Sequence, residues 1–282
     1  MPQEKDLTIC IKGKLLDFNT PKIMGIVNFT TDSFYEKSRR NLEALKYADI
    51  IDIGACSTRP GAEMVGAEEE WRRLEPVLKA VRERFPDIRL SIDTCWSTVV
   101  RNAYNLIGDF IVNDISAGED DPCMLLTVGE LDLKYVAMHK RGTPISMHEL
   151  TDYKSVVEDV AEYFRKFSKK ASVSGVRRWI LDPGFGFAKT ITQNYQILRE
   201  LEAFTEVRRT DGTRPPLLIG VSRKSMIYKK FSISPEEALS ATQVLHYVAL
   251  TNGADILRVH DVAEARRTVE LYRILQPLTL CD

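Results

Sequence analysis

Short, strongly apolar segments alternate along this chain with longer segments in which apolar residues recur every three or four positions. The short segments are apolar on both of their alternating faces, which is typical of parallel strands buried between two layers. This pattern predicts eight strands, at Lys22–Asn28, Asp49–Gly54, Ile88–Asp93, Phe110–Asn113, Lys134–Met138, Trp179–Asp182, Leu217–Gly220 and Ile256–His260.

The longer segments predict helices between these strands. In Glu68–Arg84, the residues Trp71, Leu74, Leu78 and Val81 form one apolar stripe at helical spacing. Ser234-Pro235-Glu236-Glu237 predicts a helix start, with an N-cap serine, a proline at the first position and a capping-box glutamate. Further helices are predicted at Thr98–Ile107, Val156–Ser172, Gln193–Phe204 and Val262–Leu275.

Eight cycles of strand and helix in 282 residues predict a (β/α)8 TIM barrel, because this fold takes about 250 residues. No long linker divides residues 1–282, so we expect a single domain. No GxGxxG follows the first strand, which argues against an open Rossmann sheet. The additional run Leu7–Lys12 predicts a short N-terminal β-hairpin over the far end of the barrel. The first crossover, with only a short stretch centred on Asn41–Tyr47 for its helix, is expected to be truncated or partly non-helical.

Composition narrows the class of protein. The 39 basic and 40 acidic side chains leave a net charge of −1, which gives no footprint for nucleic acid or a membrane surface. Neither a signal peptide nor an apolar run of membrane-spanning length is evident. The five cysteines are scattered without CxxC spacing, so we expect buried thiols and a reducing, cytoplasmic setting.

Polar residues follow the predicted strands at nearly every C-terminal end, where barrel enzymes carry their catalytic groups. A lone Asp or Asn there is usually a helix cap, but a set that recurs at seven of eight ends predicts an active site. Arg258 and His260 share one face of their strand. The set comprises Asn28, Asp93, Asn113, Asp114, His139, Asp182, Ser222, Arg223, Lys224, Arg258 and His260.

These side chains suit two kinds of ligand. Lys224, Arg258 and His260 come from the last two strands, where such barrels commonly bind phosphate. Asp93, Asn113 and Asp182 supply acceptors and an amide for a flat heterocycle with N–H donors. The alternative for Lys224 and Arg258 is an ion-paired surface, and for His139 and His148 a structural histidine, so we assign no chemistry to either histidine.

Two loops add candidate closing elements. Asn28–Phe34 is polar and aromatic, and Ser57–Gly61 is a compact cationic turn. Polar loops that follow barrel strands often close over a substrate.

Together these motifs resemble the dihydropteroate synthase family, the folate-pathway enzymes that sulfonamides inhibit. The resemblance runs from about Lys22 to Val262 and keeps the motifs in order. They are Met24–Asn28 with Thr30–Phe34, Asp52–Gly54 with Ser57–Gly61, Ile92–Thr94, Asn113–Ser116, Met138-His139, Asp182–Phe187, Ser222–Ser225 and Arg258–Asp261.

The resemblance implies condensation of 6-hydroxymethyl-7,8-dihydropterin pyrophosphate with 4-aminobenzoate, and Asp93, Asp182, Lys224, Arg258 and His260 as catalytic residues. It also implies three sets of binding residues. These are Asp93, Asn113, Met138, Asp182, Phe187 and Lys224 for the pterin; Asn28, Arg258 and His260 for pyrophosphate, with Mg²⁺ at Asn28; and Thr58, Arg59, Pro60 and Ser222 for 4-aminobenzoate.

Departures from the family pattern concentrate in the first loop and its connection: Thr31, Glu36-Lys37-Ser38, Cys56, Ala188 and the short first helix. Two alternatives therefore stay open, a pterin-binding methyltransferase-type enzyme and a catalytically silent pterin-binding relative. A homodimer formed through the late helices, opposite the site, is implied by the family alone.

Overall fold

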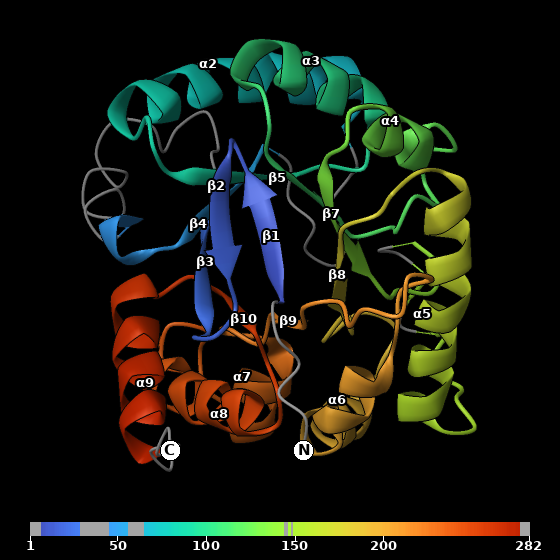
Figure 1. Ribbon diagram of the computed structural model, residues 1–282. Helices are drawn as coiled ribbons and strands as arrows, with labels where there is room; N and C mark the ends of the chain where they lie inside the picture. The colour runs from blue at the N-terminus through green and yellow to red at the C-terminus, as the bar shows by residue number, and fades with distance from the viewer. Residues whose placement is uncertain (1–6, 29–44, 56–64, 144–145, 148, 277–282) are drawn as a thin grey trace, which may run out of the picture.

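The computed structural model describes residues 7–28, 45–55, 65–143, 146–147 and 149–276. Eight parallel strands form one sheet in the order β8-β7-β6-β5-β4-β3-β10-β9. The two outer strands meet through a parallel bridge between Leu181 and Leu217, which brings the sheet round into a barrel. Helices surround it on the outside (Figure 1). The predicted (β/α)8 barrel is confirmed.

The strands match the predicted segments closely, and three of them agree to the residue. The barrel strands are β3 (Lys22–Asn28), β4 (Ile50–Gly54), β5 (Arg89–Asp93), β6 (Ile111–Asp114), β7 (Lys134–Met138), β8 (Trp179–Asp182), β9 (Leu218–Ile219) and β10 (Ile256–Val259). The helices are η1 (Leu45–Tyr47), α2 (Ala67–Arg84), α3 (Ser97–Ile107), α4 (Met124–Glu130), α5 (Val156–Val173), α6 (Ile191–Arg199), η2 (Leu201–Glu206), α7 (Ser225–Phe231), α8 (Leu239–Thr251) and α9 (Val262–Leu275).

Alternation along each strand divides the apolar core in two. In β4, Ile51 and Ile53 join a large core that includes the inner faces of the helices, while Ile50 belongs to a second core inside the barrel. The same division holds for the other strands. The inward-facing apolar residues are Met24, Ile50, Ile111, Val136, Ile180, Leu218 and Ile256.

The predicted N-terminal hairpin covers this inner core. Strands β1 (Thr8–Ile11) and β2 (Lys14–Asp17) pair antiparallel and lie across one end of the barrel (Figure 1). Ile9, Ile11 and Leu16 are buried against the inward-facing residues. The N-terminal end of the barrel is therefore a closed apolar plug.

The predicted helix Gln193–Phe204 is wrong in one respect, because it divides into α6 and η2. The Asn252 amide donates to the carbonyl oxygens of Leu198 at 2.8 Å and Arg199 at 3.4 Å. These bonds satisfy carbonyls that the last turn of a helix leaves unpaired, which favours an end at this point. The following turn continues as a 3₁₀ helix.

The capping box at Ser234 forms as predicted, with the Ser234 N–H donating to Glu237 at 2.9 Å and the Glu237 N–H to Ser234 at 3.3 Å. The helix start predicted there is wrong, because residues 235–238 form a turn and α8 begins only at Leu239. Of the first crossover, the described part is the 3₁₀ turn η1. Cys95 is buried, but Cys10 and Cys123 are exposed, so the expectation of buried thiols is wrong for these two. None of the described helices has the length and apolarity to cross a membrane.

Candidate active site

Along several strands, the inward-facing side chain two residues after the apolar core residue is polar. Ile50 is followed on the same face by Asp52, Ile111 by Asn113, and Ile180 by Asp182. Val136 is likewise followed by Met138, and Ile256 by Arg258. The strands thus bring a polar layer together inside the barrel at their C-terminal ends, where enzymes of this fold place their active sites.

Arg258 lies at the centre of this layer. Its Nε donates to Asp52 Oδ2 at 2.7 Å, and its Nη2 donates to Asp93 Oδ2 at 2.7 Å. Asn113 Nδ2 donates to the same Asp52 oxygen at 3.0 Å. Burial works against the guanidinium charge, but the carboxylates of Asp52 and Asp93 outweigh it and raise the pKa of Arg258. Arg258 is therefore cationic at any physiological pH.

Asp93 ends β5 and is 8 % exposed. Burial raises the pKa of its carboxyl to about 7, with the charge of Arg258 opposing the rise and that of Asp52 adding to it. A carboxyl that titrates near neutrality can either accept or donate a hydrogen bond at physiological pH. Such perturbed groups concentrate at functional sites.

Asp182 and Lys224 form the opposite side of the layer. Asp182 accepts a hydrogen bond from the Gly184 N–H at 2.8 Å; burial raises the pKa of this carboxyl, and the charge of Lys224 opposes the rise. Lys224 donates to the Phe185 carbonyl, and its Nζ lies 5.0 Å from the centre of the Phe187 ring. Burial lowers the pKa of Lys224 to about 8, against the effect of Asp182.

The loop that carries Phe187 packs tightly against the end of β7. Gly184 has a φ of +73°, and a Cβ there would lie 2.0 Å from the His139 carbonyl oxygen, so only glycine fits. Lys189 reaches beneath this loop and donates to the carbonyls of Gly184 and Phe187, each at 3.0 Å. Met138, 3 % exposed, ends β7 beside it.

His139 serves this packing. Its Nδ1 lies 2.9 Å from Lys189 Nζ, and its ring stands edge-on to Tyr163 at 4.9 Å. Burial, reinforced by the charge of Lys189, lowers the pKa of His139 to about 2. The histidine is therefore neutral, consistent with our assigning it no chemistry.

Ser222 and His260 meet beyond β9 and β10. The Ser222 Oγ lies 3.1 Å from His260 Nδ1 and accepts from the His260 N–H at 3.2 Å. His260 is exposed, whereas Ser222 is buried. Next to them, Arg223, which follows β9, makes two hydrogen bonds of 2.8 and 2.6 Å to Asp261, which follows β10, so its charge is paired between the two loops.

Asp114 follows Asn113 but has a structural part. Its carboxylate accepts from the N–H groups of Ser116 and Gly118 and from the Tyr135 hydroxyl. It therefore organises the turn after β6. A polar residue does end β6 as predicted, but the Asp114 side chain stabilises the following turn and does not face the site.

Asp52 belongs to the motif Asp52–Gly54, but the sequence interpretation assigned it no role in the site; it lies within β4 and not at its end. The signal was present, because a carboxylate inside the otherwise apolar run Ile50–Gly54 is buried and must be paired. Asn28 ends β3, and its side chain lies outside the described residues, as do Thr58, Arg59, Pro60 and His148. Both predicted closing loops also fall largely there, so their roles stay predictions.

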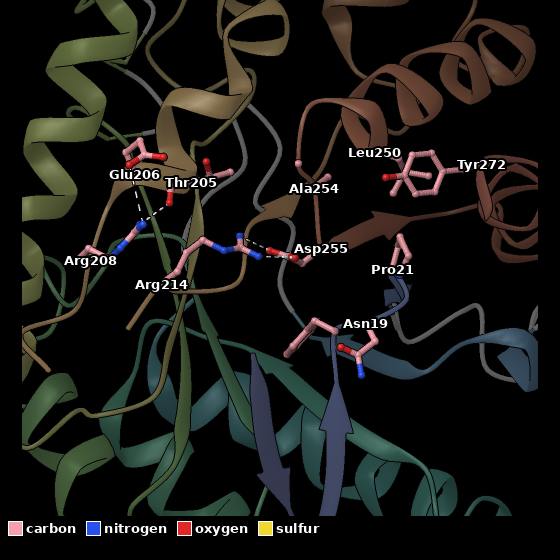
Figure 2. Close-up of a pocket in the computed structure, with 12 residues that line it drawn as sticks. Asn19, Pro21, Thr205, Glu206, Arg208, Arg214, Leu250, Ala254, Asp255 and Tyr272 are labelled. Atoms are coloured by element: carbon pink, nitrogen blue, oxygen red, sulfur yellow. Dashed lines mark hydrogen bonds and ion pairs between the residues drawn. The ribbon is translucent and has the colours of Figure 1, made fainter. Parts of the chain in front are cut away.

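The structure also contains a cavity of about 540 Å³ at the other end of the barrel. Figure 2 shows Arg214 directed at Asp255 there, and the two side chains are joined by two hydrogen bonds of 2.8 and 2.9 Å. Arg208, in the same cavity, bonds the Thr205 carbonyl. None of the residues that the sequence assigns to the site lines this cavity.

Known proteins resemble this chain over most of its length. A family model described as "Pterin binding enzyme" matches residues 24–260. The dihydropteroate synthase of Escherichia coli K12 is 37% identical over 277 residues, which cover 94% of each chain. The chain belongs to the dihydropteroate synthase family of pterin-binding enzymes.

Solved structures of dihydropteroate synthases share the whole fold. The Yersinia pestis enzyme, solved with a sulfonamide drug complex, superimposes with a TM-score of 0.87 at 31% identity, covering 95% of this chain and 98% of that one. The Burkholderia cenocepacia enzyme, complexed with 7,8-dihydropteroate, gives a TM-score of 0.85 at 33% identity, covering 95% and 96%. The family resemblance inferred from the motifs is confirmed.

Proposed function

We propose that this chain condenses 6-hydroxymethyl-7,8-dihydropterin pyrophosphate with 4-aminobenzoate, giving 7,8-dihydropteroate and pyrophosphate. The observation that carries this proposal is the polar layer, in which the acceptors Asp93, Asn113 and Asp182 lie inside the barrel with the cations Lys224 and Arg258. Membership of the family supplies the reaction.

The pterin ring would lie between Asp93 and Asn113 on one side of this layer and Asp182 and Lys224 on the other. Its ring N–H and amino groups need acceptors, which Asp93, Asn113 and Asp182 would supply. Its carbonyl oxygen needs a donor, which the Lys224 ammonium would supply. Met138 and Phe187 would cover its faces, since flat heterocycles bind between apolar walls. These residues would fix the orientation of the ring before reaction.

The leaving group requires positive charge. Breaking the C–O bond between the pterin methylene and pyrophosphate leaves a cation conjugated to the ring and an electron pair on the departing oxygen. Arg258, His260 and Asn28 would stabilise the departing pyrophosphate. The amine of 4-aminobenzoate then forms the new C–N bond and releases a proton. Because this amine is a weak base, no strong catalytic base is required.

We further propose that Mg²⁺ accompanies the pyrophosphate at Asn28. An amide oxygen and phosphate oxygens are ligands that Mg²⁺ accepts readily. Among the described residues, no group of three His, Cys, Asp or Glu side chains could hold a metal. When bound, the ion would neutralise charge on the leaving group. Calorimetry with inorganic pyrophosphate tests this: added Mg²⁺ should tighten binding to the natural chain and not to Asn28→Ala.

Thr58, Arg59, Pro60 and Ser222 would hold 4-aminobenzoate. The Arg59 guanidinium offers a planar fork for its carboxylate, and Ser222 lies beside His260 in the described part of the chain. Arg59→Ala should therefore raise the KM for 4-aminobenzoate and leave that for the pterin unchanged.

A pyrophosphate-release assay with both substrates tests the function. We expect release that depends on 4-aminobenzoate. Tight binding of the pterin without release would support the catalytically silent alternative. Methyl transfer from a methylated pterin, without pyrophosphate chemistry, would support the methyltransferase alternative.

We propose a homodimer formed through α8 and α9. Large apolar side chains are exposed on both helices, among them Val244 at 62 % and Ile274 at 76 %. An exposed apolar patch of this kind is typical of an interaction surface. Analytical ultracentrifugation should show a dimer that Ile274→Glu dissociates, while Val173→Glu, at an exposed position on α5, leaves it intact.

We also propose a cytoplasmic setting. The cysteines of the described chain, Cys10, Cys95 and Cys123, are free thiols, in line with a reducing compartment. Fractionation of cells that express the chain, followed by immunodetection, tests this; recovery in the membrane or secreted fraction would contradict it.

A further inference from the structure

Asp52 is a deeply buried carboxylate beneath the proposed site. It is 1 % exposed and lies two residues after Ile50, on the inward face of β4. Asp52 opens the motif Asp52–Gly54, but the proposed reaction gives it no role. Burying a carboxylate at this depth costs free energy unless its hydrogen-bond and ion-pair partners offset that cost.

The partners of Asp52 are Asn113 of the proposed pterin set and Arg258 of the proposed pyrophosphate set. One oxygen, Oδ2, accepts from Arg258 Nε at 2.7 Å and from Asn113 Nδ2 at 3.0 Å. These donors come from β10 and β6, which lie two strands away on either side of β4 in the sheet. Asp52 thus joins two groups that no direct strand pairing brings together.

Two hydrogen bonds fix the orientation of the Arg258 guanidinium. Its side chain has many rotamers, and two acceptors at different nitrogens restrict it to one orientation. Nε is held by Asp52 and Nη2 by Asp93. Without Asp52, the guanidinium would have Asp93 as its remaining described carboxylate partner. It could then turn towards Asp93, an acceptor that the pterin needs.

We propose that Asp52 is a positioning residue of the site: its carboxylate orients Asn113 for the pterin ring and keeps the Arg258 guanidinium from turning onto Asp93. This inference rests on the proposed function. It distinguishes Asp52 from Asp93 and Asp182, which would contact the ring, because Asp52 acts through its two neighbours.

The test compares the natural chain with Asp52→Asn, which keeps the shape of the side chain and removes its charge. Binding of 6-hydroxymethylpterin is measured by calorimetry. Loss of a charge-assisted hydrogen bond should weaken binding by roughly 10- to 100-fold. The KM for the pterin pyrophosphate should rise accordingly, while that for 4-aminobenzoate stays within about twofold.

Asp114→Asn is the matched control. Asp114 is also a buried carboxylate at a strand end, but it bonds Ser116, Gly118 and Tyr135. We expect it to lower the melting temperature and leave the pterin Kd nearly unchanged. Equal weakening of pterin binding by both variants would mean that general loosening explains the effect, and would overturn the proposal.

A double-mutant cycle separates positioning from stability. In an Arg258→Met background, adding Asp52→Asn should change the pterin Kd by less than about threefold, because Arg258 can no longer turn onto Asp93 and the new amide oxygen can still accept from Asn113 Nδ2. Asp52→Asn also removes the carboxylate that Arg258→Met leaves without its cation, so the double variant can be compared with Arg258→Met even if Asp52→Asn alone does not fold. An undiminished effect in the Arg258→Met background would overturn the proposal.

The outcomes also separate this inference from the proposed function. If the natural chain fails to bind 6-hydroxymethylpterin, the proposed function fails and the inference with it. If the natural chain binds and Asp52→Asn binds equally well, only the part assigned to Asp52 is overturned.

Discussion

The two ends of the barrel are built from the same strands, yet they differ in what the inward-facing positions carry. At the N-terminal end these positions hold Ile50, Ile111 and Ile180, sealed by the hairpin. Two residues further along the same strands they hold Asp52, Asn113 and Asp182. The N-terminal end thus stabilises the barrel, and the C-terminal end carries the polar side chains of the proposed site.

The polar end is stable because the apolar end supports it. Burying several carboxylates in one layer raises the pKa of Asp93 and Asp182, which opposes ionisation. Arg258 and Lys224 compensate for part of that cost. The closed core beneath them, which includes Met24, Ile50 and Ile256, holds the strands in register under the polar layer.

The largest effect should come from removing either cation of the polar end. Lys224→Ala and Arg258→Ala should each reduce kcat/KM by roughly 100-fold or more while leaving the fold intact, because they remove charge that stabilises the bound pterin or its leaving group. Steady-state kinetics and circular dichroism would check this. Turnover like that of the natural chain in both variants would remove our assignment of these residues.

A substitution at the apolar end should lower stability and leave activity nearly unchanged. Ile180 is fully buried in the inner core beside Val136. Ile180→Ala should lower the free energy of unfolding by about 2–5 kcal/mol, through lost burial and a cavity. The kcat/KM of the protein that stays folded should be nearly unchanged. Chemical denaturation and kinetics on one preparation would show whether the two ends separate in this way.

The pH dependence should report the polar end alone. Burial raises the pKa of Asp93 to about 7 and lowers that of Lys224 to about 8. If the reaction needs Asp93 ionised and Lys224 protonated, kcat/KM for the pterin falls up to tenfold per pH unit below about 7 and above about 8. Lys224→Arg should remove the alkaline limb, since arginine stays protonated. A limb that persists in this variant would belong to another group.

The smallest effect on turnover should come from the cavity at the N-terminal end. Arg214→Met removes the pair with Asp255 shown in Figure 2. We expect lower stability and a change of less than about twofold in kcat/KM, since no catalytic group lies there. A large loss of turnover at full folding would show that this cavity contributes to function.

Much of this architecture could be predicted from local pattern. The bounds of β3, β7 and β8 were predicted to the residue, because each is a short apolar run between polar segments. Asp93, Asn113, Asp182 and Lys224 were predicted as site residues from their places at or just after strand ends.

What could not be predicted depends on contacts across the closed barrel. Arg258 and Asp52 are 206 positions apart, and only the circular strand order brings them together. The end of α6 likewise depends on Asn252, which comes from the end of α8. Because side chains alternate along a strand, the inward-facing Ile50 would have predicted that Asp52 also faces inward. Its partners Arg258 and Asn113 could be identified only from the folded barrel.

A crystal structure with 6-hydroxymethylpterin pyrophosphate tests the central claim most directly, because it shows which end of the barrel binds. Our account places the ring within hydrogen-bond distance of Asn113 and Asp182, with Arg258 still bonded to Asp52. Density for the ring in the cavity beside Arg214 and Asp255, or a ring that contacts none of the polar layer, would contradict it.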